Sequence, residues 1–116
     1  MADPRTDFSG FEVVVSPRAD HTEVRLRGEL DLASAPRLAE SLTKACARGL
    51  GVVVDVSDLS YCDSSGIREL LEGAARCKEH DARLTVTGAS DSVRRVLDVT
   101  GVAGALGLAD GADDLR

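Results

Sequence analysis

Aromatic side chains are scarce in this chain of 116 residues, which has no tryptophan, one tyrosine and two phenylalanines. Modules that read single-stranded nucleic acids stack the bases on aromatic side chains, so the composition argues against such a module. Lysine and arginine are also in deficit, at 14 against 20 acidic residues. The resulting net charge of −6 argues against strong binding to nucleic acid or to an anionic membrane. An acidic surface is compatible with a basic protein partner.

Long apolar runs and cysteine motifs are missing as well. No run approaches the roughly 20 residues of a membrane span, and the first residues lack the apolar stretch of a secretory signal. We therefore predict a cytoplasmic protein that does not bind membranes. The three cysteines, Cys46, Cys62 and Cys77, show no CxxC spacing. We interpret them as small buried hydrophobic residues in a reducing compartment, and we predict no metal and no cofactor.

The remaining composition is that of one folded domain, with 43% hydrophobic and 29% charged residues. We expect a flexible leader over residues 1–9, a single domain over 10–108 and a frayed acidic tail over 109–116. The apolar patterns and turn residues predict the order β-β-α-β-α-β-α-β. Strands are expected at 11–15, 23–30, 52–56, 84–87 and around 105–106, and helices at about 35–48, 64–79 and 90–101.

Hydrophobic periodicity supports these elements. Residues 23–30 alternate between apolar and charged side chains, which is typical of a half-exposed strand. Residues 52–56 form a continuous apolar run, as in strands covered on both faces. The helix at 64–79 carries apolar residues at helical spacing, namely Ile67, Leu70, Leu71, Ala74 and Ala75. Strands that alternate with helices predict an α/β fold with a mixed, mostly parallel sheet.

The candidate site is the polar stretch from Asp63 to Gly66, between the most apolar strand and the second helix. The N-terminus of a helix favours negative charge, so a phosphate on Ser64 or Ser65 would be stabilised there. Gly66 has no Cβ and would let a partner approach closely. Asp and Ser are also the commonest helix caps, and most such clusters do nothing else. The residues alone leave both interpretations open.

Two motifs resemble the STAS family, the anti-sigma factor antagonists. One is VVVDVSDLSYCDSSGIRELL at 52–71, and the other is RGELDLASAPRL at 27–38. The resemblance spans roughly residues 11–106. It implies an antagonist whose serine directly after the motif aspartate, here Ser64, accepts phosphate from a partner. That partner would be a serine kinase that doubles as an anti-sigma factor, and a serine phosphatase would reset the switch.

The resemblance also implies which residues surround the phosphosite. The motif places Asp63, Ser65 and Gly66 beside Ser64, and the Gly-Glu-Leu-Asp segment adds Asp31. The surrounding segment contributes two further residues to the expected partner-binding face, Asp58 and Ile67. Cys62 departs from the family pattern, in which larger apolar residues are common at this position.

The sequence leaves three functions to compare. The first is the phosphorylated partner switch, as a monomer or weak dimer. The second is a STAS subunit of a transport or signalling complex that is not phosphorylated. The third, a serine hydrolase, requires a base beside the serine, and nothing in the sequence places His21 or His80 near Ser64. We therefore predict that the protein is not an enzyme.

Overall fold

A four-stranded sheet in the order β1-β2-β3-β4 organises the chain. The computed structural model describes residues 10–99. β1 pairs with β2 antiparallel, and β2–β3 and β3–β4 pair in parallel, which confirms the mixed, mostly parallel α/β sheet. In chain order the elements are β1 (Phe11–Pro17), β2 (His21–Leu30), α2 (Ala35–Ala47), β3 (Gly51–Cys62), α3 (Ser64–Glu79), β4 (Leu84–Thr87) and α4 (Asp91–Val99).

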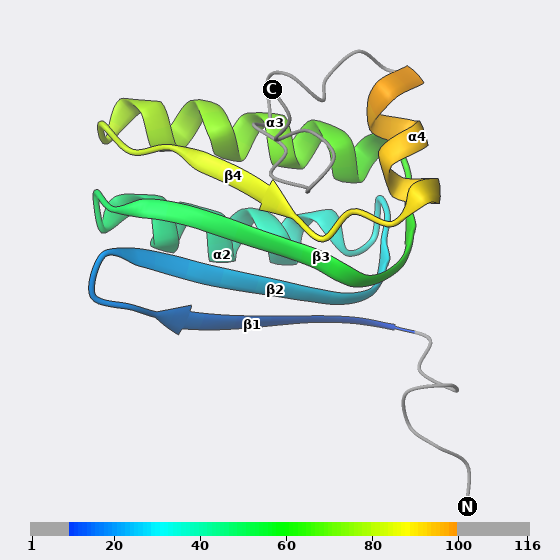
Figure 1. Ribbon diagram of the computed structural model, residues 1–116, viewed down its shortest axis with the longest axis horizontal. Coiled ribbons are helices and arrows are strands. Elements are labelled where there is room, and N and C mark those ends of the chain that lie inside the picture. The colour runs from blue at the N-terminus through cyan, green and yellow to red at the C-terminus, as the bar shows by residue number, and fades with distance from the viewer. Residues whose placement is uncertain (1–9, 100–116) are drawn as a thin grey trace, which may run out of the picture.

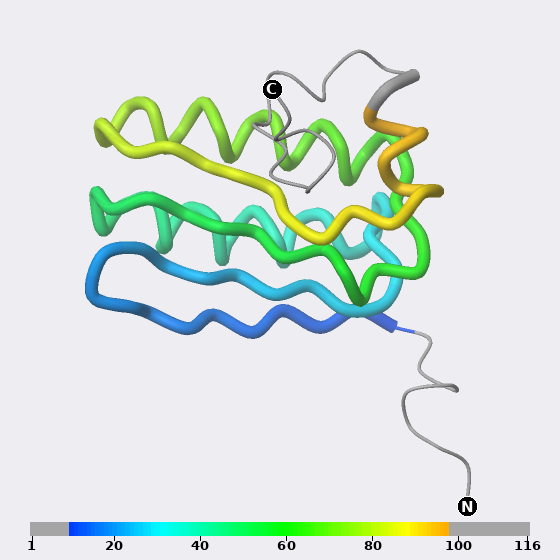
Figure 2. Tube along the Cα trace, in the orientation of Figure 1, coloured from blue at the N-terminus to red at the C-terminus, as the bar shows by residue number. Residues whose placement is uncertain are grey.

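Helices α2 and α3 lie on the same face of this sheet (Figure 1). Each connects two neighbouring parallel strands, and consecutive crossovers of one hand that advance in one direction leave their helices on one side. The trace shows both helices starting at the end of the sheet where β2 and β3 finish (Figure 2). α4 lies beside that same end. This arrangement brings two helix starts and two strand ends together.

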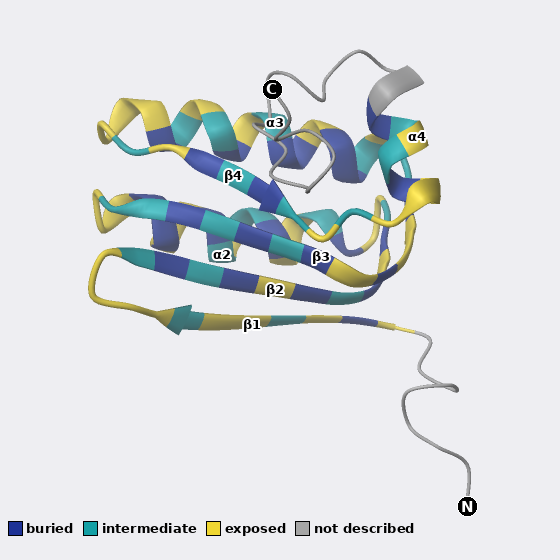
Figure 3. Ribbon diagram, viewed as in Figure 1, coloured by how far each residue is buried: buried dark blue, intermediate teal, exposed yellow. Residues whose placement is uncertain are grey.

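The core lies between the sheet and the two helices (Figure 3). The predicted inward residues of β2, Val24, Leu26 and Leu30, are buried, as expected. The apolar run in β3 was predicted to be covered on both faces, but only one face is fully buried. Val52 and Val54 are buried but Val53 is only half-buried, because α2 and α3 cover one face of the strand. Ala75, predicted on the apolar face of its helix, is exposed.

β3 is longer than predicted, because it continues to Cys62. Its polar second half stays paired with β2 through two register shifts, between Arg25 and Arg27 and between Gly28 and Glu29. The backbone of Gly28 takes a positive φ of 97°, which glycine adopts without a steric penalty. Residues 58–62, expected as a loop, are therefore strand. β1 also extends by two residues to Pro17, which an edge strand tolerates.

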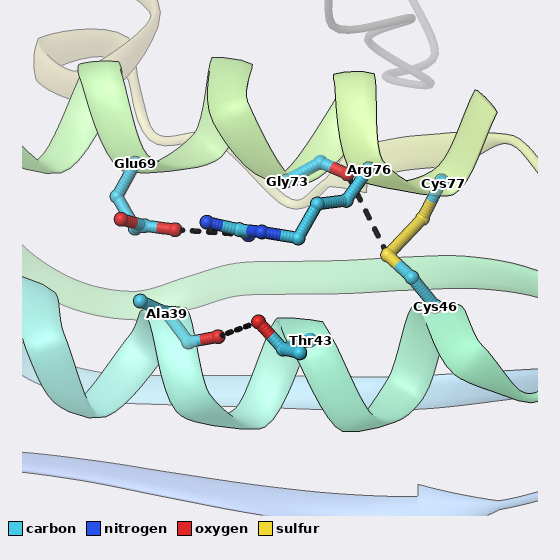
Figure 4. Close-up of a disulfide and its surroundings, with 7 residues drawn as sticks. All are labelled: Ala39, Thr43, Cys46, Glu69, Gly73, Arg76 and Cys77. Atoms are coloured by element: carbon cyan, nitrogen blue, oxygen red, sulfur yellow. Dashed lines mark hydrogen bonds and ion pairs between the residues drawn. A yellow bond between two sulfur atoms is a disulfide. The ribbon is translucent and has the colours of Figure 1, made fainter. Parts of the chain in front are cut away.

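Cys46 of α2 and Cys77 of α3 form a disulfide, with their Cα atoms 4.8 Å apart (Figure 4). Both residues are fully buried. The interpretation of all three cysteines as buried hydrophobic residues was right about burial but missed this bond. The two residues are 31 positions apart, and only the packing of α2 on α3 brings them together. Cys62 is buried and remains free.

The last predicted strand, around 105–106, lies outside the described residues, as do the leader 1–9 and the tail 109–116. Helix α3 matches its predicted bounds, 64–79, and β4 matches 84–87. Within residues 10–99, no helix has the length and apolar character that crossing a membrane requires.

Candidate functional site

The start of α3 is fixed to the end of β2 by the backbone. The amide of Asp63 donates a hydrogen bond to the carbonyl oxygen of Leu30, with 3.1 Å between the two atoms. Asp31 follows Leu30 directly, so the turn at Asp31 and the first turn of α3 are neighbours. This edge of the sheet, at the carboxyl ends of β2 and β3, is where ligand and partner sites of open α/β sheets gather.

Asp63 is the N-cap of α3. Its backbone is extended, and its Oδ1 atom accepts hydrogen bonds from the amides of Ser65, at 2.9 Å, and Gly66, at 3.2 Å. The capping interpretation of the motif is therefore confirmed for this residue. Ser64 is exposed, and within residues 10–99 its hydroxyl makes no hydrogen bond. One aspartate thus satisfies the helix start, which leaves the serine hydroxyl available for another role.

Asp31 stabilises the loop that precedes α2, whose N-cap residue is Ser34. Its Oδ1 atom accepts from the amides of Ala33, at 3.1 Å, and Ser34, at 3.0 Å. The Ser34 hydroxyl in turn accepts from the Asp31 amide at 2.8 Å and lies 2.9 Å from the carbonyl oxygen of Glu29. Asp31 lines a hollow together with Phe11 and Arg37. Ser64 does not line this hollow. The Asp31 carboxylate is therefore held within its own loop.

Ser64 opens onto a cavity of about 260 Å³ between the starts of α2 and α3. The cavity is lined by Leu32, Ala35, Ser64, Ser65, Arg68 and Glu69. Leu32, next to Asp31, is 75% exposed and forms an apolar rim. Arg68 is exposed, and no ion pair involves it in the described part of the chain. The serine hydroxyl therefore shares its surroundings with one available cation and one exposed apolar side chain.

Glu69 is the buried acid of this cavity. Its carboxylate accepts a hydrogen bond from the Arg76 guanidinium at 3.2 Å, and its side chain is 10% exposed. Burial raises the pKa of Glu69 above its ordinary value, and the charge of Arg76 offsets part of that rise.

Burial, together with the charge of Asp63, also raises the pKa of Cys62 to about 11. The thiol next to the motif is therefore protonated at neutral pH and is a poor nucleophile.

Gly66 and Ile67 are both buried. A Cβ built on Gly66 would lie 2.6 Å from Cγ of Leu30 and 3.0 Å from Sγ of Cys62. The glycine therefore allows a close approach inside the domain, between α3 and the ends of β2 and β3, where the sequence had suggested a close approach by a partner. Ile67 belongs to the hydrophobic core. These two buried residues pack the first turn of α3, which carries Ser64 and Ser65, against the rest of the domain.

Asp58 lies apart from the other candidate residues. It is paired with Arg27 in the sheet, and its carboxylate is 3.7 Å from the Arg25 guanidinium. Cys62 follows it by four positions along β3, which corresponds to about 13 Å. The structure thus groups Asp63, Ser64 and Ser65 with the Asp31 turn but leaves Asp58 on the open face of the sheet.

Comparison with known proteins agrees with this architecture. A family model described as "Mlab, STAS domain" matches residues 13–109. The chain belongs to the STAS domain family. An anti-sigma-B factor antagonist from Staphylococcus epidermidis is 30% identical over 95 residues, which cover 81% of this chain and 88% of that protein.

Solved structures share the fold of this STAS domain. The anti-sigma factor antagonist from Mycobacterium paratuberculosis has a TM-score of 0.79 at 21% identity, covering 98% of this chain and 94% of that one. The antagonist SpoIIAA in its unphosphorylated form has a TM-score of 0.72 at 22% identity, with 88% of each chain covered. SpoIIAA of Bacillus in its phosphorylated form has a TM-score of 0.66 at 22% identity, covering 92% and 100%. The predicted fold is confirmed.

Sequence reasoning missed four of the residues that line the cavity of this STAS domain: Leu32, Ala35, Arg68 and Glu69. A signal for two of them was available, because Arg68 follows Ser64 by four positions and Glu69 follows Ser65 by four. Residues at that spacing share one helix face. Leu32 carried no such signal, since only the contact between the Asp31 turn and α3 brings it to the cavity.

Proposed function

We propose that this STAS domain is an anti-sigma factor antagonist that is switched by phosphorylation of Ser64. In the unmodified state it binds a kinase-type anti-sigma factor in the cytoplasm, as a monomer or weak dimer. Phosphorylation by that partner releases it, and a serine phosphatase restores it. The observation that carries the proposal is the exposed Ser64 hydroxyl, which is unbonded within residues 10–99 and stands directly after the capping Asp63.

The two serines of the motif differ in a way that supports Ser64 as the acceptor. Ser64 is exposed, whereas Ser65 is half-buried and its amide is engaged by Asp63. A kinase active site must surround the acceptor hydroxyl, so exposure favours the first serine. The solved forms of SpoIIAA, a relative in fold, include a phosphorylated one.

The charge of the phosphate accounts for release. Phosphoserine carries about −1.5 to −2 charges at pH 7. The amides of Ser65 and Gly66 are already bonded to Asp63, so the phosphate cannot take them without displacing the cap. At about 6 Å and an effective dielectric of about 20, the Asp63 carboxylate opposes the phosphate by roughly 4–5 kcal/mol before salt screening. Water screens this repulsion in the free protein.

A closed partner interface removes that water, and the repulsion then weakens the complex. Loss of about 3 kcal/mol of binding free energy corresponds to a roughly hundredfold weaker complex. Asp31 adds less to this repulsion than Asp63 does, because it lines the hollow beside Phe11 and Arg37 and not the cavity of Ser64. We expect release by local repulsion and bulk, with the sheet and helices unchanged.

Intrinsic catalysis is not part of the proposal. His21 opens β2 and is paired with Gly51 at the start of β3, and His80 follows the last turn of α3. Both histidines therefore lie at the opposite end of the sheet from Ser64, too far to act as a base for its hydroxyl. Pure protein should hydrolyse neither esters nor ATP.

The decisive experiment is phosphorylation by the cognate anti-sigma factor with ATP, followed by peptide mapping. We expect modification of Ser64 in the wild type and in the Ser65→Ala control, and none in Ser64→Ala. The Ser64→Ala variant should stay bound to the anti-sigma factor in the presence of ATP. Phosphate on Ser65 alone would reassign the site. Stable binding to a membrane-transport or signalling assembly, without any phosphorylation, would favour the alternative of an unmodified STAS subunit.

A further inference from the structure

We propose that Cys46 and Cys77 are a reversible redox pair, whose disulfide ties α2 to α3 and sets the stability of the domain. The inference is independent of the proposed function. Its basis is the placement of two buried cysteines from different helices, with Cα atoms 4.8 Å apart, in a distance range that disulfides require.

The sulfur of Cys46 has a partner in both redox states. In the oxidised state it is bonded to Cys77. It also lies 3.5 Å from the carbonyl oxygen of Gly73, which accepts a hydrogen bond from the thiol once the disulfide is reduced (Figure 4). A disulfide sulfur has no hydrogen to donate, so only the reduced thiol can make this hydrogen bond. An acceptor for the Cys46 thiol is therefore already in place at this distance.

Access to the buried sulfurs is provided by the ends of the helices. Cys46 precedes Ala47, the last residue of α2, and Cys77 lies two residues before Glu79, the last of α3. Helix termini open locally at a lower free energy than helix centres. A small reagent can therefore reach these sulfurs without unfolding of the domain.

The oxidant we propose is a low-molecular-weight disulfide such as oxidised glutathione. One cysteine, as its thiolate, attacks a glutathione sulfur, which forms a mixed disulfide and releases one glutathione thiolate. The thiolate of the second cysteine then attacks the protein sulfur of that mixed disulfide and releases the second glutathione. Two electrons pass from the protein to the glutathione, and the two thiol protons go to the released thiolates or to water. A dithiol reagent reverses both steps.

The bond lies at the far end of the helix pair from the candidate site. Cys77 follows Ser64 by thirteen positions in α3, or about 20 Å along the helix axis. Oxidation should therefore stabilise the domain without altering the surroundings of Ser64.

The disulfide closes a loop between two residues 31 positions apart, which restricts the conformations of the unfolded chain. This restriction should raise the melting temperature by about 10–15 °C.

The test compares full-length protein after incubation with oxidised glutathione or with dithiothreitol. Thiols that remain free are alkylated under denaturing conditions and located by mass spectrometry. We expect three alkylated cysteines after reduction and only Cys62 after oxidation, with a linked Cys46–Cys77 peptide. The oxidised protein should melt higher by the stated amount, and its amide spectrum should change in the last turns of α2 and α3 but not at Ser64.

Matched variants complete the test. Cys62→Ala should keep the redox-dependent shift in melting temperature. The double variant Cys46→Ala with Cys77→Ala should melt at one temperature in both buffers, near that of the reduced wild type. Three free thiols after oxidation, a bond that involves Cys62, or a disulfide between two chains would overturn the proposal. So would equal melting temperatures of the oxidised and reduced wild-type proteins.

Discussion

Replacement of Asp63 by alanine should destabilise the domain by about 2 kcal/mol. The carboxylate accepts two backbone hydrogen bonds, from Ser65 and Gly66. Loss of an N-cap typically costs about 1 kcal/mol. Gly66 is buried, so its amide has no ready access to water, and a buried donor without an acceptor costs about 1–3 kcal/mol. The two figures describe partly the same lost hydrogen bonds, so the lower end of their sum, about 2 kcal/mol, is expected.

Urea unfolding, followed by circular dichroism at pH 7, measures this change directly. For a chain of 116 residues the unfolding entropy is roughly 0.24 kcal/mol/K, so 2 kcal/mol lowers the melting temperature by about 8 °C. Asp63→Asn is the matched variant, because its side-chain oxygen can still cap the helix without the charge. Asp63→Asn should lose only about 0.5 kcal/mol of stability, because it removes the interaction between the charge and the helix dipole. Ser64→Ala, at an exposed position, should change stability by less than about 0.5 kcal/mol.

Two results would refute this reasoning. If Asp63→Ala and Asp63→Asn lost the same free energy, the charge and not the hydrogen bonds would stabilise the helix start. If Ser64→Ala lost as much as Asp63→Ala, then Ser64 would itself be structural, and its exposed hydroxyl could not be taken as reserved for phosphorylation.

Three further predictions follow from contacts of the same region. Gly66→Ala should destabilise by about 1–2 kcal/mol in urea unfolding, because its Cβ would overlap Leu30; a gain in stability would contradict the packing. The raised pKa of Glu69 means that the folded state binds its proton more tightly than the unfolded state, so this group's contribution to stability falls as pH rises from about 4 towards neutrality. Glu69→Gln should lack this fall in pH-dependent urea curves, and an unchanged pH profile would argue against the effect. Cys62, with a pKa of about 11, should react with iodoacetamide at pH 7.5 far more slowly in the native protein than in urea.

Local interactions account for what could be predicted from the sequence. Helix α3 was found at its correct bounds because its apolar residues recur at helical spacing and Asp63 caps it from one position away. The antiparallel β1–β2 pair and the parallel order of β2, β3 and β4 followed from short connections and from helices between strands. The position of Ser64 at the start of α3 was likewise predicted, because strand, cap and helix start are consecutive in the chain. Its choice as the phosphate acceptor came from the family resemblance and stays a prediction.

The tertiary structure decided everything that depends on which distant segments meet. Leu30 of β2 explains why position 66 is a glycine, and neither residue indicates the other in the sequence. The extension of β3 to Cys62 depends on pairing with β2 through shifted register, which overrides the polar composition of its second half. Cys46 and Cys77 became a disulfide only when two helices packed. Spacing along a chain reports contacts within a few residues, whereas contacts across 30 residues depend on how the whole sheet and helix layer pack.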